Sequence, residues 1–241
     1  MVGMGCQTIA LDGAMGTRLQ QEGLAAGMFS PSFNVQNPQI VRKIHQLYLD
    51  AGARILLTNT FGATSEEEFA GAVQCIQNLS GDYRIAGSIG PTTSLEWVNL
   101  LAPVVDFFIM ETFSDLEAAR KTFSRLKTFR RQIAISFAWI CHDEQFHLYS
   151  GETLHDVLQE IRYWPLLAFG SNCAIGPALS CKLGERIAEQ SPFDVWIKSN
   201  ADSTPENFAR DLAPLIGVAR YVGGCCGADE AHIGAFHRLL S

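Results

Sequence analysis

Short apolar runs alternate with longer amphipathic segments along almost the whole chain. The short runs are rich in β-branched and aromatic residues, as buried strands are, and each is followed by a segment with the helical period. The candidate strands are residues 7–13, 53–61, 83–90, 105–113, 132–140, 165–173, 194–201 and 219–226. Strands that alternate with helices in this way favour a parallel sheet with crossover helices.

Two of the helical segments also carry terminal signals. Residues 114–129 begin at Ser114, the expected N-cap, and gather Lys and Arg toward their end, as the helix dipole prefers. Residues 205–217 place Pro205 at the expected first helical position, where its missing N–H costs nothing. These signals support the alternation of elements read from the apolar pattern.

Eight strand–helix units without a linker, an internal repeat or a composition shift predict a (β/α)8 TIM barrel, α/β in class, in which residues 1–241 form a single domain. A doubly wound open sheet is the alternative. Residues 66–80 and 92–103 are short for crossover helices, so we expect a compact barrel with shortened second and third crossover segments. A barrel of this kind carries its chemistry at the carboxyl ends of the strands.

Composition and charge narrow the class of partner. The formal net charge of −7 opposes binding to nucleic acid or to anionic membranes, because clustered Lys and Arg side chains make those contacts. The N-terminus lacks the basic start and long apolar run of a signal peptide, and the most apolar stretch is broken by Pro103 and Asp106. We therefore expect a cytoplasmic protein with no nucleic-acid or membrane partner.

Polar residues stand where several of the apolar strands end. They are Asp12, Asn59, Glu111, Cys173, Asn200, Cys225 and Cys226. In a barrel the carboxyl ends of the strands share one rim, so we expect these side chains to converge on a site there. Each has a plainer interpretation when taken singly, such as a turn, a loop hydrogen bond or a small core cysteine. The histidines at 142, 147, 155, 232 and 237 fall in turns or helices and are expected on the surface.

The two adjacent cysteines lie between glycines. Neighbours on a regular strand point to opposite faces, so Cys225 and Cys226 reach one ion only where Gly223, Gly224 and Gly227 let the chain leave strand geometry. Cys173, on a strand of the same parity, supplies a third thiol. Three thiolates suit Zn²⁺ and leave its fourth position open. A packing pair and a redox-active disulfide stay open as alternatives, because the pair lacks CxxC spacing.

Seven motifs resemble the homocysteine S-methyltransferase family, which includes the homocysteine-binding barrel of cobalamin-dependent methionine synthase. In order, they are LDGAMGTRLQ, TNTFGA, GSIGPT, METFSDLEAA, SGET, SNCAIGP and GGCCG. The resemblance covers nearly the whole chain and implies that catalytic zinc is bound by Cys173, Cys225 and Cys226. It also implies that the head group of homocysteine is held by Asp12, Glu111 and the backbone amides around Gly13 and Ala14. Asn59 and Asn200 match motif positions near the metal, where an Asn oxygen fills the open position without substrate.

The activity that the resemblance implies is attack of a zinc-bound homocysteine thiolate on an activated methyl group, which forms methionine. SNCAIGP and SGET resemble the methionine synthase branch, and shortened loops suit a bulky donor, so we expect the donor to be a methylcorrinoid. We expect a partner protein to carry it, because the chain has no room for a corrinoid domain and residues 229–234 miss the DxHxxG signature. The alternatives are an S-methylmethionine- or betaine-type donor, methylation of another small thiol, and a zinc-binding barrel without turnover. The shortened crossovers leave the identity of the donor open.

Overall fold

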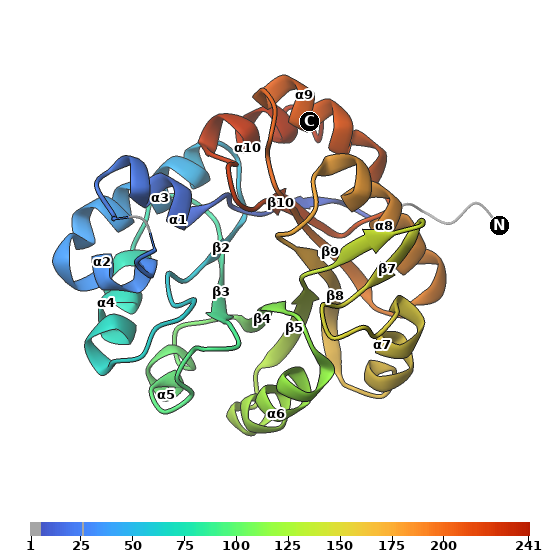
Figure 1. Ribbon diagram of the computed structural model, residues 1–241. Helices are drawn as coiled ribbons and strands as arrows, with labels where there is room; N and C mark the ends of the chain where they lie inside the picture. Colours follow the sequence, from blue (N-terminus) through green and yellow to red (C-terminus); the bar gives the residue numbers. More distant parts are fainter. Residues whose placement is uncertain (1–5, 26) are drawn as a thin grey trace.

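The computed structural model describes residues 6–25 and 27–241, and within them eight parallel strands form a ring that helices surround (Figure 1). The strands are β1 (Ile9–Ala10), β2 (Ile55–Leu57), β3 (Arg84–Ile89), β4 (Phe107–Phe113), β5 (Gln132–Phe137), β8 (Leu166–Asn172), β9 (Asp194–Ser199) and β10 (Tyr221–Gly224). Their order is β1-β10-β9-β8-β5-β4-β3-β2. A parallel bridge between Leu11 and Ile55 joins the two ends. The (β/α)8 barrel is therefore confirmed, and the doubly wound alternative is wrong.

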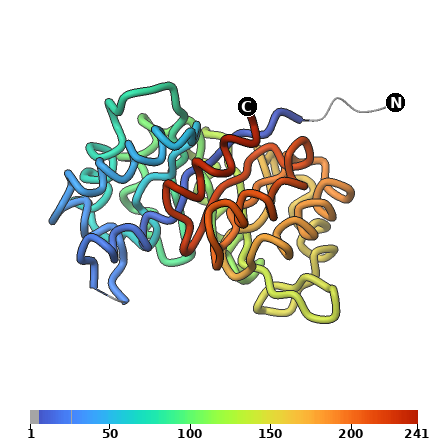
Figure 2. The backbone as a smooth tube through the Cα atoms, turned by 90° about the horizontal axis from the view of Figure 1, so that it is seen from above, coloured from blue at the N-terminus to red at the C-terminus, as the bar shows by residue number. Residues whose placement is uncertain are grey.

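Helices cover the outside of the ring, as Figures 1 and 2 show from two directions. They are α1 (Met15–Gln21), α2 (Phe33–Gln36), α3 (Pro38–Asp50), α4 (Glu66–Ile76), α5 (Val98–Leu101), α6 (Leu116–Leu126), α7 (Leu154–Ile161), α8 (Pro177–Gln190), α9 (Pro205–Leu212) and α10 (Glu230–His237). Short 3-10 turns lie at Ser30–Ser32, Lys127–Phe129 and Ala213–Leu215. The third crossover carries only the four residues of α5 in this part of the chain, in line with the expected shortening.

The helix ends follow the sequence signals with one correction. Thr204 caps α9, and Pro205 occupies the first helical position as predicted. The N-cap of α6 is Asp115 rather than Ser114, because the Asp115 carboxylate accepts the Ala118 N–H at 2.7 Å. The Ser114 carbonyl instead accepts a hydrogen bond from the Ser150 hydroxyl at 2.9 Å. Ser114 thus ties the start of α6 to the loop that precedes α7.

A two-stranded antiparallel hairpin, β6 (Ile140–His142) and β7 (Gln145–His147), lies between β5 and α7 and was absent from the sequence expectation. It lies in the yellow-green segment that projects from the barrel in Figure 2. Its turn residues Asp143 and Glu144 both have positive φ, at 48° and 60°. Such turns are usually marked by Asn-Gly or Asp-Gly, so Asp-Glu gave no hairpin signal.

The barrel interior is packed with apolar side chains. They come from β2, β3, β4, β5, β8, β9 and β10 and from the residue after β1, and they are Leu11, Ile55, Leu57, Ala86, Phe107, Ile109, Ala134, Ala168, Trp196 and Tyr221. The ring of Trp196 lies edge-on to Phe107 at 6.1 Å between centroids. A Cβ on Gly170 would lie 1.6 Å from the Trp196 carbonyl oxygen, so this position requires glycine. These apolar side chains, called the apolar plug below, fill the interior, so polar groups that could bind a substrate are expected at the rim.

Among the helices of the described residues, none has both the length and the apolar character that crossing a membrane requires.

Candidate active site

A cavity of about 260 Å³ opens at the carboxyl ends of the strands. The predicted site residues that line it are Asp12, Gly13, Ala14, Asn59, Glu111, Cys173, Cys225 and Cys226. Asn200 is the one predicted residue outside this lining. A larger cavity, about 370 Å³, lies at the opposite end of the barrel and includes Arg54, Arg84 and His237. That end of a TIM barrel ordinarily serves stability, and the expected chemistry is gathered in the first cavity.

The three thiols meet at one point of the rim. The Sγ atoms of Cys173, Cys225 and Cys226 all lie within 4.8 Å of one another. The distance from Cys173 Sγ to Cys226 Sγ is 3.7 Å. Two thiolates bound to one zinc ion at about 2.3 Å and at the tetrahedral angle lie about 3.8 Å apart, so the donor set fits zinc. All three are free cysteines, and their separation is not that of a disulfide.

Backbone geometry brings these thiols together. Cys173 and Ala174 follow β8 with φ values of 57° and 62°, in the left-handed region that non-glycine residues rarely adopt. Gly227 has a φ of 83°, and a Cβ there would lie 2.2 Å from the Ala201 carbonyl oxygen. The turn of residues 225–228, called the cysteine turn below, therefore depends on Gly227 as expected. Gly223 and Gly224 have a different role.

Gly223 and Gly224 still belong to strand β10, and neither has a positive φ. A Cβ on Gly223 would lie 2.8 Å from the Asp12 carbonyl oxygen. A Cβ on Gly224 would lie 2.2 Å from the Ala228 Cβ. The expectation that these two glycines let the chain leave strand geometry is corrected, because they permit close packing of β10 against its neighbours.

The thiols share their protons unequally. Hydrogen bonds with Cys173 and Cys225 lower the pKa of Cys226, against the effect of burial. Hydrogen bonds with Cys173 and Cys226, together with burial, raise the pKa of Cys225. The pKa shifts of Cys225 and Cys226 therefore have opposite directions within one hydrogen-bonded cluster.

Asp12 forms a buried ion pair with Lys198, a residue of β9 that sequence analysis missed. Asp12 Oδ1 contacts Lys198 Nζ, while Oδ2 accepts the Leu57 N–H at 2.8 Å. The side chains are 5% and 4% exposed. Burial raises the pKa of Asp12, against the Lys198 charge. Burial lowers the pKa of Lys198, but Asp12 and Glu111 outweigh it, so the net direction is upward and the lysine is an ammonium.

Glu111 is held by hydroxyl and amide donors. Its Oε1 accepts a hydrogen bond from the Ser88 hydroxyl and its Oε2 from Asn172 Nδ2 at 3.4 Å. Burial raises the pKa of Glu111, and the charge of Lys198 opposes that shift. Asn172 Oδ1 also accepts the Thr112 N–H at 2.8 Å. Thr112 has a φ of 62°, a strained value for a β-branched residue, and Asn172 fixes it beside Glu111.

A family model for homocysteine S-methyltransferase matches residues 9–240. The chain belongs to the homocysteine S-methyltransferase family. It is 24% identical to the S-methylmethionine–homocysteine S-methyltransferase BHMT2 of Pongo abelii, over 95% of this chain and 77% of that protein. It is 26% identical to the methionine synthase of Mycobacterium tuberculosis, over 92% of this chain and 24% of the synthase. The chain thus spans about a quarter of that second relative.

Solved structures agree with the fold. The metallated form of the homocysteine methyltransferase MmuM of Escherichia coli superposes with a TM-score of 0.81, at 21% identity and over 96% of both chains. The apo form of the same protein gives a TM-score of 0.76 at 24% identity, over 97% of this chain and 96% of that one. The family assignment makes this chain a methyltransferase, and the family match confirms the resemblance read from the sequence motifs.

The two predicted asparagines of this methyltransferase have different surroundings. Asn59 Nδ2 donates to the Ser30 carbonyl and to Asn34 Oδ1, both at 2.9 Å, so Asn59 holds a loop that lines the cavity. Asn200 Oδ1 is buried and has no hydrogen-bond partner among the described residues. Its backbone lies beside the cysteine turn, because the next residue, Ala201, donates its N–H to the Cys226 carbonyl at 2.9 Å.

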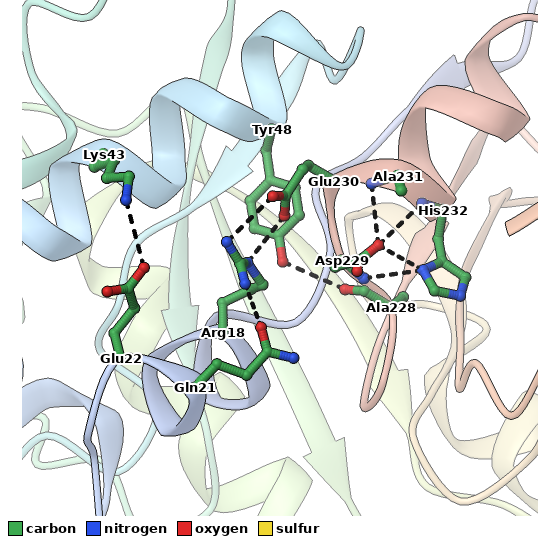
Figure 3. Close-up of polar contacts among 10 residues, drawn as sticks. All are labelled: Arg18, Gln21, Glu22, Lys43, Tyr48, Ala228, Asp229, Glu230, Ala231 and His232. Carbon is green, nitrogen blue, oxygen red and sulfur yellow. Dashed lines mark hydrogen bonds and ion pairs between the residues drawn. The ribbon is translucent and has the colours of Figure 1, made fainter. Parts of the chain in front are cut away.

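The backbone turn after β1 packs tightly in this methyltransferase. The Ala14 N–H donates to the Ala228 carbonyl at 2.8 Å. A Cβ on Gly13 would lie 2.5 Å from the same oxygen, which requires glycine there. Tyr48 also donates its hydroxyl hydrogen to the Ala228 carbonyl, at 3.3 Å (Figure 3). The first turn and the cysteine turn therefore hold each other in place.

An ion pair and a capped helix support the cysteine turn from outside. Arg18 Nε lies 2.9 Å from Glu230 Oε2, which joins α1 to α10 (Figure 3). Asp229 caps α10 and contacts His232 Nδ1 at 2.6 Å. His232 is 8% exposed, so its expected surface position is wrong. Its helical position gave no sign that the side chain packs inward against Phe208.

Proposed function

We propose that this methyltransferase methylates the thiol of homocysteine at the rim cavity, with Zn²⁺ held by Cys173, Cys225 and Cys226. The observation that carries the proposal is the meeting of three sulfur atoms within 4.8 Å, from two turns far apart in the sequence. Their 3.7 Å contact agrees with the spacing of about 3.8 Å expected for two thiolates on one zinc ion. We also propose that residues 1–241 act as a single barrel domain.

When bound, zinc supplies a Lewis acid that favours the thiolate form of the substrate, whose free pKa is about 8.5. The chain contributes binding and orientation. The cysteine turn and Cys173 define where the substrate sulfur sits. Asn200 is the candidate for the fourth ligand before substrate binds, which its buried and unpartnered Oδ1 supports.

The head group of homocysteine binds in the same cavity in this proposal. Asp12, paired with Lys198, and Glu111 line that part of the cavity, and Gly13 and Ala14 form the backbone turn beside them. Asn59 contributes by holding the loop at Ser30, which also lines the cavity. Orientation by such fixed groups converts the encounter of thiol and methyl donor into a step with little entropic cost.

We propose a methylcorrinoid on a partner protein as the donor. The 26% identity to a methionine synthase supports this class of donor. The third crossover carries only the four-residue helix α5, and a reduced crossover suits a bulky donor. The second candidate is S-methylmethionine, a compound in the name of the Pongo abelii relative. Parallel assays of homocysteine with methylcobalamin, S-methylmethionine and betaine separate the donors.

Replacement of one zinc ligand tests the function. Cys226→Ala should remove bound zinc and abolish methionine formation, because two thiolates no longer complete the site. Cys75→Ala is the matched control, since Cys75 is a buried cysteine of α4 whose thiol donates to the Pro38 carbonyl. The control should keep its zinc and its activity. Metal analysis and methionine formation are measured on both variants. Full zinc content and full turnover in Cys226→Ala would contradict the proposal.

A protein that binds zinc but methylates no thiol with any of the three donors would favour the alternative of a barrel without turnover. Methylation of other small thiols in preference to homocysteine would favour the alternative of a different acceptor. Mass spectrometry of the products, with homocysteine and other thiols offered together, distinguishes these outcomes.

A further inference from the structure

The ion pair of Lys198 and Asp12 is the least expected feature of the cavity. Both residues line it, and both side chains are nearly inaccessible from outside. Burying two charges is expensive, and the gain from pairing them commonly does no more than offset that cost. A buried pair in the lining of a cavity therefore points to a role in binding.

The pair changes what Asp12 offers to a substrate. One of its oxygens contacts the Lys198 ammonium, and the other accepts the Leu57 N–H. A substrate ammonium that approached Asp12 would meet the Lys198 ammonium at close range, in surroundings where like charges repel strongly. Glu111 is left as the carboxylate that can receive a substrate ammonium.

The Lys198 ammonium has N–H groups that are free to bind a substrate. A lysine ammonium carries three N–H groups, and among the described residues its hydrogen bond goes to Asp12 Oδ1. The backbone offers less, because the Ala14 N–H already donates to the Ala228 carbonyl. The strongest donor for a carboxylate within the cavity lining is therefore the ammonium of Lys198.

The direction of the Lys198 side chain also supports a role as the partner of a substrate carboxylate. Trp196 lies in the apolar plug of the barrel, and Lys198 is two residues further along β9. Residues two apart on a strand point to the same face, so Lys198 points into the barrel one layer nearer the rim. It lies on the strand between β8 and β10, which precede the three cysteines. A carboxylate at Lys198 therefore belongs to a molecule whose thiol reaches the cysteines.

We infer that Lys198 is the specificity-determining residue of this site: it neutralises Asp12 and binds the carboxylate of the substrate. The preferred substrates are then small thiols that carry a carboxylate, and the α-ammonium group contributes less. The inference rests on the proposed methyl transfer to a thiol at this cavity.

Three thiols test it with the zinc-loaded protein. Homocysteine carries both charges, 4-mercaptobutyrate lacks the ammonium, and 3-aminopropane-1-thiol lacks the carboxylate. Binding is measured by titration calorimetry, which needs no methyl donor, and kcat/KM is measured separately. Loss of the carboxylate should weaken binding about 100-fold, the usual scale for a buried charged hydrogen bond, whereas loss of the ammonium should cost less than about 10-fold.

Lys198→Met should reverse this order, because it removes the carboxylate partner and frees Asp12 for an ammonium. Since that variant leaves Asp12 buried without a cation, the double variant Lys198→Met with Asp12→Asn removes both charges and is measured beside it. In the double variant the carboxylate preference should also disappear. Lys182→Met is the matched control, a lysine of α8 with a 58% exposed side chain, and should leave all three affinities unchanged.

The outcomes separate this inference from the proposed function. If the affinities follow the carboxylate and respond to Lys198 but no thiol is methylated, the proposed function fails and the inference stands. If homocysteine is methylated but both analogues bind equally, or their ratio is unchanged in both Lys198 variants, the inference is overturned.

Discussion

His45 gives the sharpest prediction about stability. It lies on α3 with no exposed surface, and neither ring nitrogen has a hydrogen-bond partner among the described residues. Burial, followed by the charges of Arg42 and Lys198, lowers the pKa of His45 to about 3. In the unfolded chain the same group has a pKa of about 6.5. Below that pH the unfolded state therefore takes up a proton that the folded state refuses.

The direction and the size of the change in the free energy of unfolding follow from the linkage between proton binding and folding. The contribution of His45 is intact above pH 6.5 and is lost as the pH falls toward 3, because only the unfolded state gains the proton. At pH 5 the loss is about 2 kcal/mol, and at pH 7 it is only about 0.2 kcal/mol. His45→Leu abolishes the effect and removes an unpartnered polar ring. The variant should therefore gain about 2 kcal/mol over the wild type between pH 7 and pH 5.

Urea unfolding followed by tryptophan fluorescence at both pH values, with equal zinc, measures this change. Other pH-dependent contributions, including those of the thiols, cancel in the difference between variant and wild type. His155→Leu is the control, because His155 is exposed on α7. A stability difference between His45→Leu and the wild type that stays the same at pH 7 and pH 5 would refute the buried, unprotonated histidine.

Two further variants test packing and positioning. Gly170→Ala places a Cβ 1.6 Å from the Trp196 carbonyl oxygen and should cost more than about 4 kcal/mol or prevent folding. Gly16→Ala, with open space around its Cβ, should gain about 0.5–1 kcal/mol. Equal melting temperatures for the two would contradict the packing of the barrel interior. Asn172→Leu leaves the Thr112 N–H without its acceptor and should cost about 1–3 kcal/mol at unchanged zinc content. Loss of zinc instead would show that Asn172 positions Cys173.

The fold could be predicted because each strand of a parallel barrel is buried on both faces and therefore appears as a short apolar run. The rim was predictable for a related reason, since residues that end such runs share one edge of the barrel. Lys198 was missed because its partner Asp12 is 186 residues away, and no local pattern reveals a contact at that separation. The hairpin of β6 and β7 was missed because its turn uses Asp143 and Glu144 in place of glycine.

The strands nevertheless contain a period-two pattern that indicates Lys198 as a buried polar residue. In four strands the residue two positions after a member of the apolar plug is polar and buried. These pairs are Ala86 and Ser88, Ile109 and Glu111, Ala134 and Ser136, and Trp196 and Lys198. Because side chains two apart point to the same face, the polar members form one layer directly above the plug.

That layer supports the proposed binding of both ends of an amino acid thiol in one barrel. The ring order places β9 between β8 and β10, so the lysine rises between the two strands that precede the cysteines. Adjacent strands are about 4.8 Å apart, so the Lys198 backbone lies close to the ends of both strands that lead into the cysteines. The proposed carboxylate site and the proposed thiol site are therefore neighbours on one side of the rim, and a small thiol that carries a carboxylate can occupy both.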